Sequence, residues 1–157
     1  MNRWMRMLAA LLAGLCFIAV SARGQTAERG SRDEAKALVD AAIAHIAKVG
    51  LDKALNDFTN DKATWTSKDL YLFVANFDGQ MMAHGSNAKL IGKDMRNVKD
   101  PNGKLMTMEF IQVASTSGSG WVDYEWPHPQ TKKFESKSAY IKRIPNFNGF
   151  MGVGVYR

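Results

Sequence analysis

The hydrophobic pattern of this chain changes its period once, at Leu70. Between Ser31 and Phe58, apolar residues recur every three or four positions, which is the spacing of an amphipathic helix. Beyond Leu70, short apolar runs with a period of two are separated by glycine, proline and asparagine, which is typical of strands joined by turns. A helical first part followed by strands predicts an α+β domain whose sheet is antiparallel.

The start and the end of the long helix are both marked in the sequence. Ser31 and Glu34 match a capping box, in which each side chain satisfies a free backbone donor of the first turn. Gly50 stands where a helix C-cap requires a positive φ. We therefore expect one long helix between these residues and a shorter second helix over 51–58.

Five strands are expected after the helices. They cover residues 70–77, 80–84, 121–126, 134–144 and 150–156. Asp78-Gly79 and Asn148-Gly149 are two-residue hairpin signals, so most of these strands should pair with their neighbours in the chain. The predicted architecture is a long N-terminal helix packed on a five-stranded antiparallel sheet.

Two further segments interrupt or weaken the strand pattern. Residues 87–103 read as a long structured loop, and loops of this length in a compact domain often carry function. Residues 104–117 can form a helix. The last strand and the turn before it contain glycines at 149, 152 and 154, which weaken a strand unless another group approaches closely there.

The first 22 residues have the composition of a secretory signal peptide. Two arginines precede an unbroken apolar run over 8–20, and small residues follow up to Ala22. This run is shorter than the roughly 20 apolar residues that a membrane span needs. We expect cleavage after Ala22, a flexible leader over 23–30 and one periplasmic domain over 31–157. An uncleaved N-terminal anchor is the alternative.

Composition excludes several classes of function. Cys16 is the only cysteine and lies in the signal segment, so the mature chain would have no disulfide, thiol nucleophile or thiolate metal site. The net charge is +6, and loss of the two N-terminal arginines leaves +4. The lysines are scattered, without a run of five or six, so nucleic-acid binding is not expected.

Motifs for catalysis and for metal binding are missing from the sequence. His45, His84 and His128 lack the spacing of metal ligands, and no nucleophile elbow or phosphate loop occurs. Asp123 and Glu125 are two residues apart, as a glycosidase pair could be, but such alternation is typical of a solvated strand face. We therefore expect no enzyme, no metal and no cofactor.

One lysine stands out within the strand pattern. Alternation places Tyr124 and Trp126 on one face of their strand, and it places Lys137 on a face of the next strand that continues with apolar residues. A lysine buried alone is costly, and an anionic ligand would offset that cost through charge-assisted hydrogen bonds. The alternative is an ion pair on the surface between Lys137 and Glu135 or Asp123.

Several short motifs follow one another in an order typical of one family. They are Asp78-Gly79, His84, Ile91-Gly92-Lys93-Asp94, the run from Gly118 to Trp126, Lys137 to Ile141, and Gly152 to Tyr156. In this order they resemble the single Cache domain, a PAS-like extracytoplasmic sensor domain of bacterial chemoreceptors and histidine kinases. The resemblance covers residues 31–156 and implies a pocket between the sheet and the long loop with its helix.

The resemblance also implies small carboxylate ligands, such as acetate, propionate, pyruvate or lactate. The candidate ligand-binding residues are Tyr124, Lys137, His84, Trp126, Trp65 and Tyr140. The family's pocket tyrosine falls on Tyr124 and its lysine on Lys137. Tyr140 is a weaker candidate, because alternation places it on the face opposite Lys137. Packing in the core is the alternative role for Trp65 and Trp126.

A receptor of this family has a transmembrane helix at each end of its sensor, whereas this sequence ends at Arg157. The expected function is that of a periplasmic module that binds a small organic anion and passes the signal to a separate membrane receptor or sensor kinase. A ligand-free interaction or homodimerisation module is the alternative, and an enzyme with an unrecognised site is the third. A buried, unpaired Lys137 beside a closed cavity would favour the first function, and a cavity filled by side chains the second.

Overall fold

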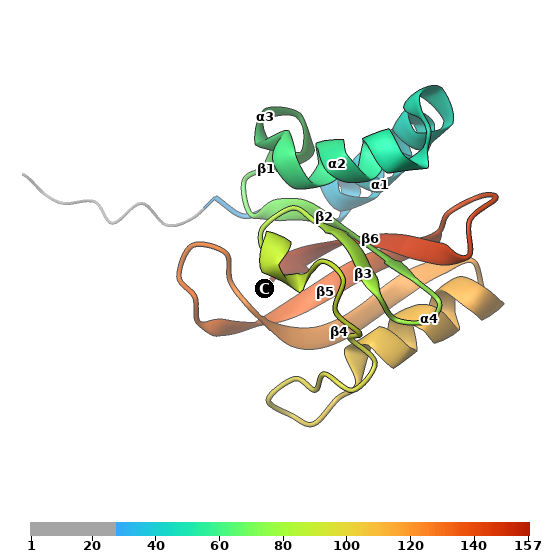
Figure 1. The fold of residues 1–157 in the computed structure, drawn as a ribbon. Coiled ribbons are helices and arrows are strands. Elements are labelled where there is room, and N and C mark those ends of the chain that lie inside the picture. Colours follow the sequence, from blue (N-terminus) through green and yellow to red (C-terminus); the bar gives the residue numbers. More distant parts are fainter. Residues whose placement is uncertain (1–27) are drawn as a thin grey trace, which may run out of the picture.

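The computed structural model describes residues 28–157, so the expected signal peptide over 1–22 lies outside the described residues. The helices are α1 (Arg32–Val49), α2 (Leu51–Asn60), α3 (Lys62–Trp65), the 3-10 turn η1 (Ala88–Leu90) and α4 (Met106–Thr116). The strands are β1 (Thr66–Ser67), β2 (Leu70–Asn76), β3 (Met81–His84), β4 (Ser119–Pro127), β5 (Phe134–Arg143) and β6 (Gly149–Tyr156). In Figure 1, α1 and α2 cover one face of the sheet and α4 lies against the other.

The sheet is antiparallel throughout and its strands run in the order β1-β2-β6-β5-β4, with β3 also paired to β2. The first and last long strands therefore lie side by side, with Leu72 opposite Val153 and Asn76 opposite Gly149. This arrangement confirms the α+β fold and the five expected strands. The two-residue strand β1 and the one-turn helix α3 were not expected from the pattern.

The capping signals of α1 form as the sequence predicts. The Ser31 hydroxyl accepts a hydrogen bond from the Glu34 backbone N–H at 3.2 Å, and the Glu34 carboxylate accepts one from the Ser31 N–H at 2.7 Å. Gly50 has a φ of 85° and separates α1 from α2. The small residues Ala35, Val39 and Ala42 are fully buried, which lets the helix lie close to the sheet.

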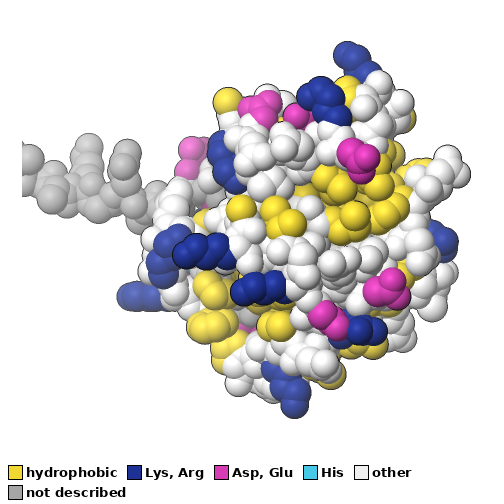
Figure 2. Space-filling view, viewed as in Figure 1, with side chains coloured by type: hydrophobic (Ala, Val, Ile, Leu, Met, Phe, Trp, Pro, Cys, Tyr) yellow, Lys and Arg dark blue, Asp and Glu magenta, His cyan; other side chains and the backbone are white. Residues whose placement is uncertain are grey.

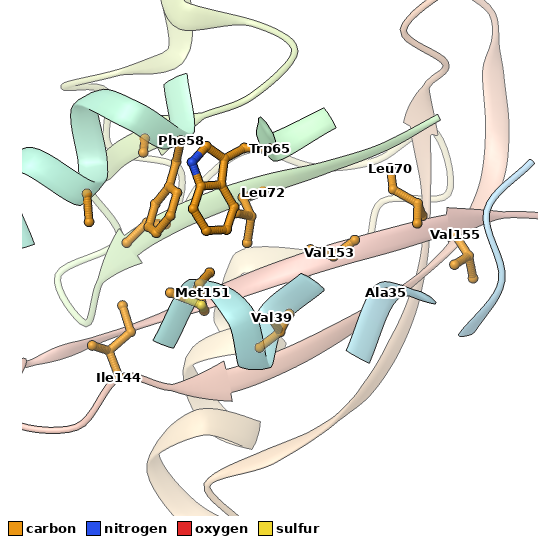
Figure 3. Close-up of a cluster of buried hydrophobic side chains, with 14 residues drawn as sticks. Ala35, Val39, Phe58, Trp65, Leu70, Leu72, Ile144, Met151, Val153 and Val155 are labelled. Atoms are coloured by element: carbon orange, nitrogen blue, oxygen red, sulfur yellow. The ribbon is translucent and has the colours of Figure 1, made fainter. Parts of the chain in front are cut away.

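The sheet has a hydrophobic cluster on each face. One lies between the sheet and helices α1 and α2, where the rings of Phe58 and Trp65 pack edge to face with centroids 4.8 Å apart (Figure 3). The other lies under α4, where Phe110 packs on Phe73 with ring centroids 5.5 Å apart. Strand β2 is buried on both faces, so its side chains contribute to both clusters in turn.

The turn between β5 and β6 differs from the expected one. Asn148-Gly149 does not form the turn; the backbone N–H of Phe147 donates to the Ile144 carbonyl, and Asn146 takes a φ of 57°. Gly149 belongs to β6 instead. A Cβ at this position would lie closer than 3.0 Å to the Ala75 carbonyl oxygen, so close strand packing explains the glycine.

The turn between β2 and β3 falls where it was expected but has three residues rather than two. Gly79 has a φ of 78° and its N–H donates to the Asn76 carbonyl at 3.0 Å. The Asn76 N–H donates to the carbonyl of Gln80, the residue before β3, at 3.1 Å. A glycine at the third loop position is the usual partner of a bulged hairpin.

The described end of the expected flexible leader contacts the folded domain. The Gly30 N–H donates to the Asp69 carboxylate at 2.7 Å, and the Arg29 guanidinium donates to Glu135 at 2.8 Å and to the Arg157 carbonyl at 3.1 Å. None of the helices within 28–157 combines the length and the apolar character that crossing a membrane requires.

Candidate ligand-binding site

A small cavity of about 20 Å³ lies on the α4 face of the sheet. It is lined by Tyr71, Phe73, Met81, His84, Met95, Met106, Thr107, Phe110, Tyr124 and Trp126. These side chains come from β2, β3, β4, α4 and the loop after β3, which is the position that the expected pocket has. The volume is about that of one water molecule, and no carboxylate stands among the lining residues.

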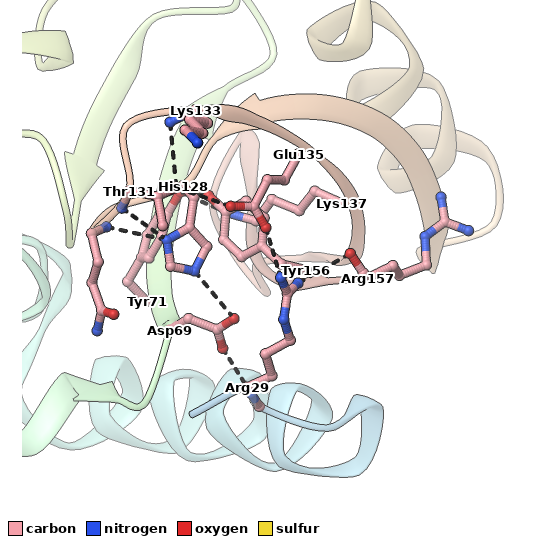
Figure 4. Close-up of polar contacts among 12 residues, drawn as sticks. Arg29, Asp69, Tyr71, His128, Thr131, Lys133, Glu135, Lys137, Tyr156 and Arg157 are labelled. Carbon is pink, nitrogen blue, oxygen red and sulfur yellow. Dashed lines mark hydrogen bonds and ion pairs between the residues drawn. The ribbon is translucent and has the colours of Figure 1, made fainter. Parts of the chain in front are cut away.

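Lys137 is completely buried beside this cavity. Its Nζ donates to the Tyr71 hydroxyl at 2.7 Å and to the Tyr156 hydroxyl at 3.3 Å, and it lies 4.0 Å and 4.4 Å from the centroids of those two rings (Figure 4). The alternative role of Lys137, a surface ion pair with Glu135 or Asp123, is therefore wrong. Lys137 does not line the cavity itself; its ammonium contacts the ring of Tyr71, which does.

The electrostatics of this cluster favour an anion nearby. Burial lowers the pKa of Lys137, whereas the contact with Tyr71 and, to a smaller extent, the negative charge of Asp69 oppose that change. Burial by itself would raise the pKa of Tyr71, but the charge and the hydrogen bond of Lys137 hold it below its ordinary value. Within residues 28–157, no carboxylate lies in ion-pair contact with the ammonium group. A negative charge in the cavity would therefore stabilise a cation that is only partly compensated.

The geometry around His84 fixes the position of its proton. Its Nδ1 accepts hydrogen bonds from the backbone N–H groups of Asn87 at 3.0 Å and Ser86 at 3.3 Å. Backbone N–H groups can only donate, so the proton of the neutral ring is on Nε2. Burial, with smaller effects from Lys137 and Lys62, lowers the pKa of His84 to about 3. His84 is thus a neutral donor at the wall of the cavity.

Two hydroxyl groups join His84 in the cavity wall. Neither Tyr124 nor Thr107 makes a side-chain hydrogen bond within residues 28–157, and the Nε2–H of His84 makes none there either. Phe110 packs edge to face on Tyr124 with ring centroids 5.2 Å apart, which holds the phenol in place. Beside the Tyr71 hydroxyl and the Trp126 indole, the cavity wall therefore has three polar groups that can donate and have no partner among residues 28–157.

The structure brings together four of the six candidate residues. Tyr124, His84 and Trp126 line the cavity, and Lys137 lies behind Tyr71. Trp65 and Tyr140 lie on the opposite face of the sheet, where they belong to the cluster under α1 and α2. The period of two along β5 turns Tyr140 away from Lys137, and Trp65 precedes β1 on the helix side. We therefore leave both of them out of the candidate site.

Sequence reasoning missed the two tyrosines that hold the lysine. Tyr71 lies in a strand that is apolar on both faces, so alternation of polarity could not assign its face. Tyr156 stands directly opposite Lys137 in the β5–β6 register. The one available signal was the phenol itself, because a buried tyrosine hydroxyl needs a hydrogen-bond partner.

The family model for Single Cache domain 2 matches residues 3–157. The chain belongs to this family. Cache domains are extracytoplasmic sensor domains, and the family is a ligand-binding signalling module. The methyl-accepting chemotaxis protein McpP of Pseudomonas putida is 30% identical over 88 residues, which are 56% of this chain and 16% of that protein. The sensor histidine kinase MctS of Rhizobium johnstonii is 29% identical over 89 residues, 57% of this chain and 19% of that protein.

Solved structures have the same fold. A periplasmic sensor domain of a chemotaxis protein has a TM-score of 0.63 and 28% identity, over 79% of this chain and 88% of that chain. A Cache chemosensory domain, described for its recognition of carboxylic acids, has a TM-score of 0.63 and 24% identity, over 79% and 86%. The Cache domain spans less than a fifth of the length of the two curated relatives that it matches.

Proposed function

We propose that this Cache domain senses a small organic anion, a C2–C4 carboxylate, in the cavity on the α4 face. The observation that carries the proposal is a set of three donors, on His84, Tyr124 and Thr107, that have no hydrogen-bond partner within residues 28–157 and lie near the buried ammonium of Lys137. A carboxylate has only acceptors, and each of these three groups can donate a hydrogen bond to it. The proposal includes no catalytic role.

The two ends of such a ligand would meet different surroundings. Its carboxylate would accept hydrogen bonds from His84 Nε2 and the Tyr124 hydroxyl, while Lys137 compensates its charge from behind the Tyr71 ring. Its short apolar tail would lie against methionine side chains. Methionine is flexible and adapts to irregular shapes, which suits a cavity that must widen around its ligand.

Binding requires such widening, because about 20 Å³ is too small for an organic acid. The loop that carries Met95 and the helix that carries Met106 are the elements that can move away from the sheet. A solved Cache domain that recognises carboxylic acids shows that this fold can do so. Since this chain is only 24% identical to that domain, the proposal that it binds a carboxylate rests on the cavity of this chain.

A membrane receptor or a sensor kinase is the proposed partner in signalling. The similar domains of McpP and MctS belong to proteins of these two classes. Export to the periplasm through a signal peptide over 1–22 is part of the same proposal. Intact-mass measurement of the exported protein should give a mass that begins at or near Arg23, and a membrane-bound product that retains the first 22 residues would contradict it.

A screen of the purified mature domain tests ligand binding directly. Acetate, propionate and butyrate should raise the melting temperature, because a ligand that binds only the folded state adds about 2.7 kcal/mol at a hundred times its Kd. The corresponding neutral amides are the control for charge. If no acid at millimolar concentration shifts the transition and calorimetry is also flat, the proposal fails.

One observation favours a second candidate function, a ligand-free interaction or homodimerisation module. A groove of about 280 Å³ lies where the end of α1 meets the β5–β6 turn, and it is lined by apolar residues that include Ile43, Ile46 and Phe147. Figure 2 shows hydrophobic side chains gathered between the helices α1 and α2 and the sheet. Sedimentation of the domain and of Ile46→Ser decides: concentration-dependent association that the substitution abolishes would support this function.

A further inference from the structure

Asp69 and His128 face each other in the interior without completing a hydrogen bond (Figure 4). Their side chains are 0% and 1% exposed, and Asp69 Oδ2 lies 3.7 Å from His128 Nε2. Neither of these two atoms has another hydrogen-bond partner within residues 28–157. Buried polar groups are nearly always paired, so this contact calls for a physical explanation.

The proton of His128 points toward the carboxylate. Its Nδ1 accepts hydrogen bonds from the backbone N–H groups of Gln130 at 3.2 Å and Thr131 at 3.3 Å, which leaves the proton of the neutral ring on Nε2. A donor therefore faces an acceptor about half an ångström beyond the usual limit of about 3.2 Å for such a bond. A small shift of either residue would close the contact.

Asp69 connects this contact to the start of α1. Its second oxygen, Oδ1, accepts the Gly30 N–H at 2.7 Å, and Gly30 directly precedes the N-cap residue Ser31. Asp69 also lies two residues before Tyr71, whose ring lines the cavity. Any displacement of this carboxylate would change how the entry to α1 is held.

His128 connects the same contact to the lysine. Its ring packs edge to face on Tyr156 with centroids 4.6 Å apart. The Tyr156 hydroxyl accepts from Lys137 at 3.3 Å and donates to the carbonyl of Pro127, the residue before His128, at 2.9 Å. A series of neighbouring groups therefore runs from Lys137 through Tyr156 and His128 to Asp69, and its last step is the 3.7 Å approach of Nε2 to Oδ2.

We infer that Asp69 and His128 are positioning residues. They couple the position of the Lys137 ammonium to the hydrogen bond that the Gly30 N–H donates to Asp69. An anion in the cavity attracts the ammonium through the Tyr71 ring and weakens its long bond to Tyr156. The loop that carries His128 then shifts relative to Asp69, and the hold on Gly30 changes. The use of this coupling by a ligand rests on the proposed function, whereas the coupling itself does not.

Amide hydrogen exchange at Gly30 in the ligand-free domain tests the coupling. Lys137→Met should speed exchange at Gly30 by about fivefold or more, the lower end of usual couplings between sites. In an Asp69→Asn background, Lys137→Met should have no further effect on exchange at Gly30. If the asparagine oxygen accepts the Gly30 N–H, its NH2 group faces His128, and an NH2 group cannot accept a hydrogen bond from Nε2–H. Tyr156→Phe should act as Lys137→Met does, since it removes the hydroxyl in the series.

Asp100→Asn provides the matched control. Asp100 is also buried and accepts backbone N–H groups, from Asn102 and Lys104 at 2.9 Å each, but it lies outside the series. In this background the effect of Lys137→Met on Gly30 should persist. The inference is overturned if Lys137→Met and Tyr156→Phe leave Gly30 exchange unchanged, or if their effect persists undiminished in Asp69→Asn.

A second measurement asks whether a ligand uses the coupling. Saturating propionate should speed local exchange at Gly30 in the same direction as Lys137→Met, and it should not do so in Asp69→Asn. Propionate that binds by calorimetry and leaves Gly30 unchanged would overturn transmission through this series. If propionate does not bind at all, the proposed function fails, and the exchange in the ligand-free variants alone decides the coupling.

Discussion

The side chain of Lys137 crosses the neighbouring strand β6 directly over Gly154. A Cβ at Gly154 would lie within 3.0 Å of three carbons of the lysine, Cγ, Cδ and Cε. Because Gly154 leaves this space open, Lys137 extends from β5 across β6 to reach Tyr71 on β2. The glycine that weakens the strand pattern is therefore the residue that lets the lysine lie flat on the sheet.

Gly154→Ala should displace the lysine and destabilise the domain. Overpacking of a filled core costs about 1–3 kcal/mol, and here it would also break the bond between Lys137 and Tyr71. Chemical denaturation measures the change. If the two side chains compete for the same space, Lys137→Ala should cost less in the Gly154→Ala background than alone, and strictly additive effects would contradict this geometry.

Lys137→Met should leave the free energy of unfolding unchanged or raise it. The substitution removes a buried ammonium that has no carboxylate in ion-pair contact within residues 28–157, but it keeps most of the apolar stem. The hydroxyls of Tyr71 and Tyr156 remain paired, because they lie 3.2 Å apart. Lys137→Ala is the control, and its loss of packing should cost about 2 kcal/mol or more. Equal losses in both variants would mean that the charge itself stabilises the fold.

Much of the fold follows from local signals in the sequence. The capping pair Ser31 and Glu34, the positive φ at Gly50 and the change of period at Leu70 each depend on neighbouring residues only, and each appears in the structure. The β5–β6 register depends on a turn that was misplaced. A two-residue turn at 148–149 would pair Lys137 with a position beyond Arg157, whereas the real turn pairs it with Tyr156.

The candidate site could be predicted only in part, because part of it depends on how the strands pair. Alternation along single strands correctly put Tyr124 and Trp126 on one face, but for Lys137 it left open both a buried position and an ion pair on the surface. The direction that a lysine takes across a sheet depends on the strands beside it, and no local pattern records that. The contacts of Lys137 with Tyr71 and Tyr156 join strands far apart in the sequence, so they emerge only from the assembled sheet.

Tyr124→Phe should separate ligand binding from folding. The ring keeps its buried area and loses one hydroxyl that has no partner within residues 28–157, so the free energy of unfolding should change by less than about 0.5 kcal/mol. Affinity for a carboxylate should fall by roughly 1–3 kcal/mol, because the lost bond goes to a charged group. Calorimetric titration with propionate measures it.

Tyr140→Phe is the matched control for this experiment. Tyr140 lies on the opposite face of the sheet, where its ring packs on Trp121 with centroids 5.4 Å apart. The affinity of the Tyr140→Phe variant for propionate should equal that of the unmodified domain. Unchanged binding in Tyr124→Phe, or an equal loss in both variants, would show that Tyr124 does not hold the carboxylate.

The pH dependence of stability should reveal the buried, neutral state of His84. Burial, with smaller effects from Lys137 and Lys62, lowers its pKa from 6.5 to about 3 in the folded domain. Between these two pH values the unfolded chain binds a proton at this ring and the folded domain does not. The contribution of His84 to stability is therefore complete above about pH 6.5 and is lost as the pH falls toward 3, with a slope of at most about 1.4 kcal/mol per pH unit.

His84→Asn isolates this contribution from the other titrating groups. The asparagine Oδ1 can accept the backbone N–H of Asn87 as Nδ1 does, but the amide does not titrate. Denaturation at several pH values should give a steeper fall in the free energy of unfolding for the unmodified domain than for the variant between pH 6.5 and pH 3. Carboxylates such as Asp100 titrate in both proteins, so the difference between the two curves belongs to His84. Parallel curves would mean that His84 takes up its proton in the folded state as readily as in the unfolded chain, and it would then not be the fixed neutral donor that the site requires.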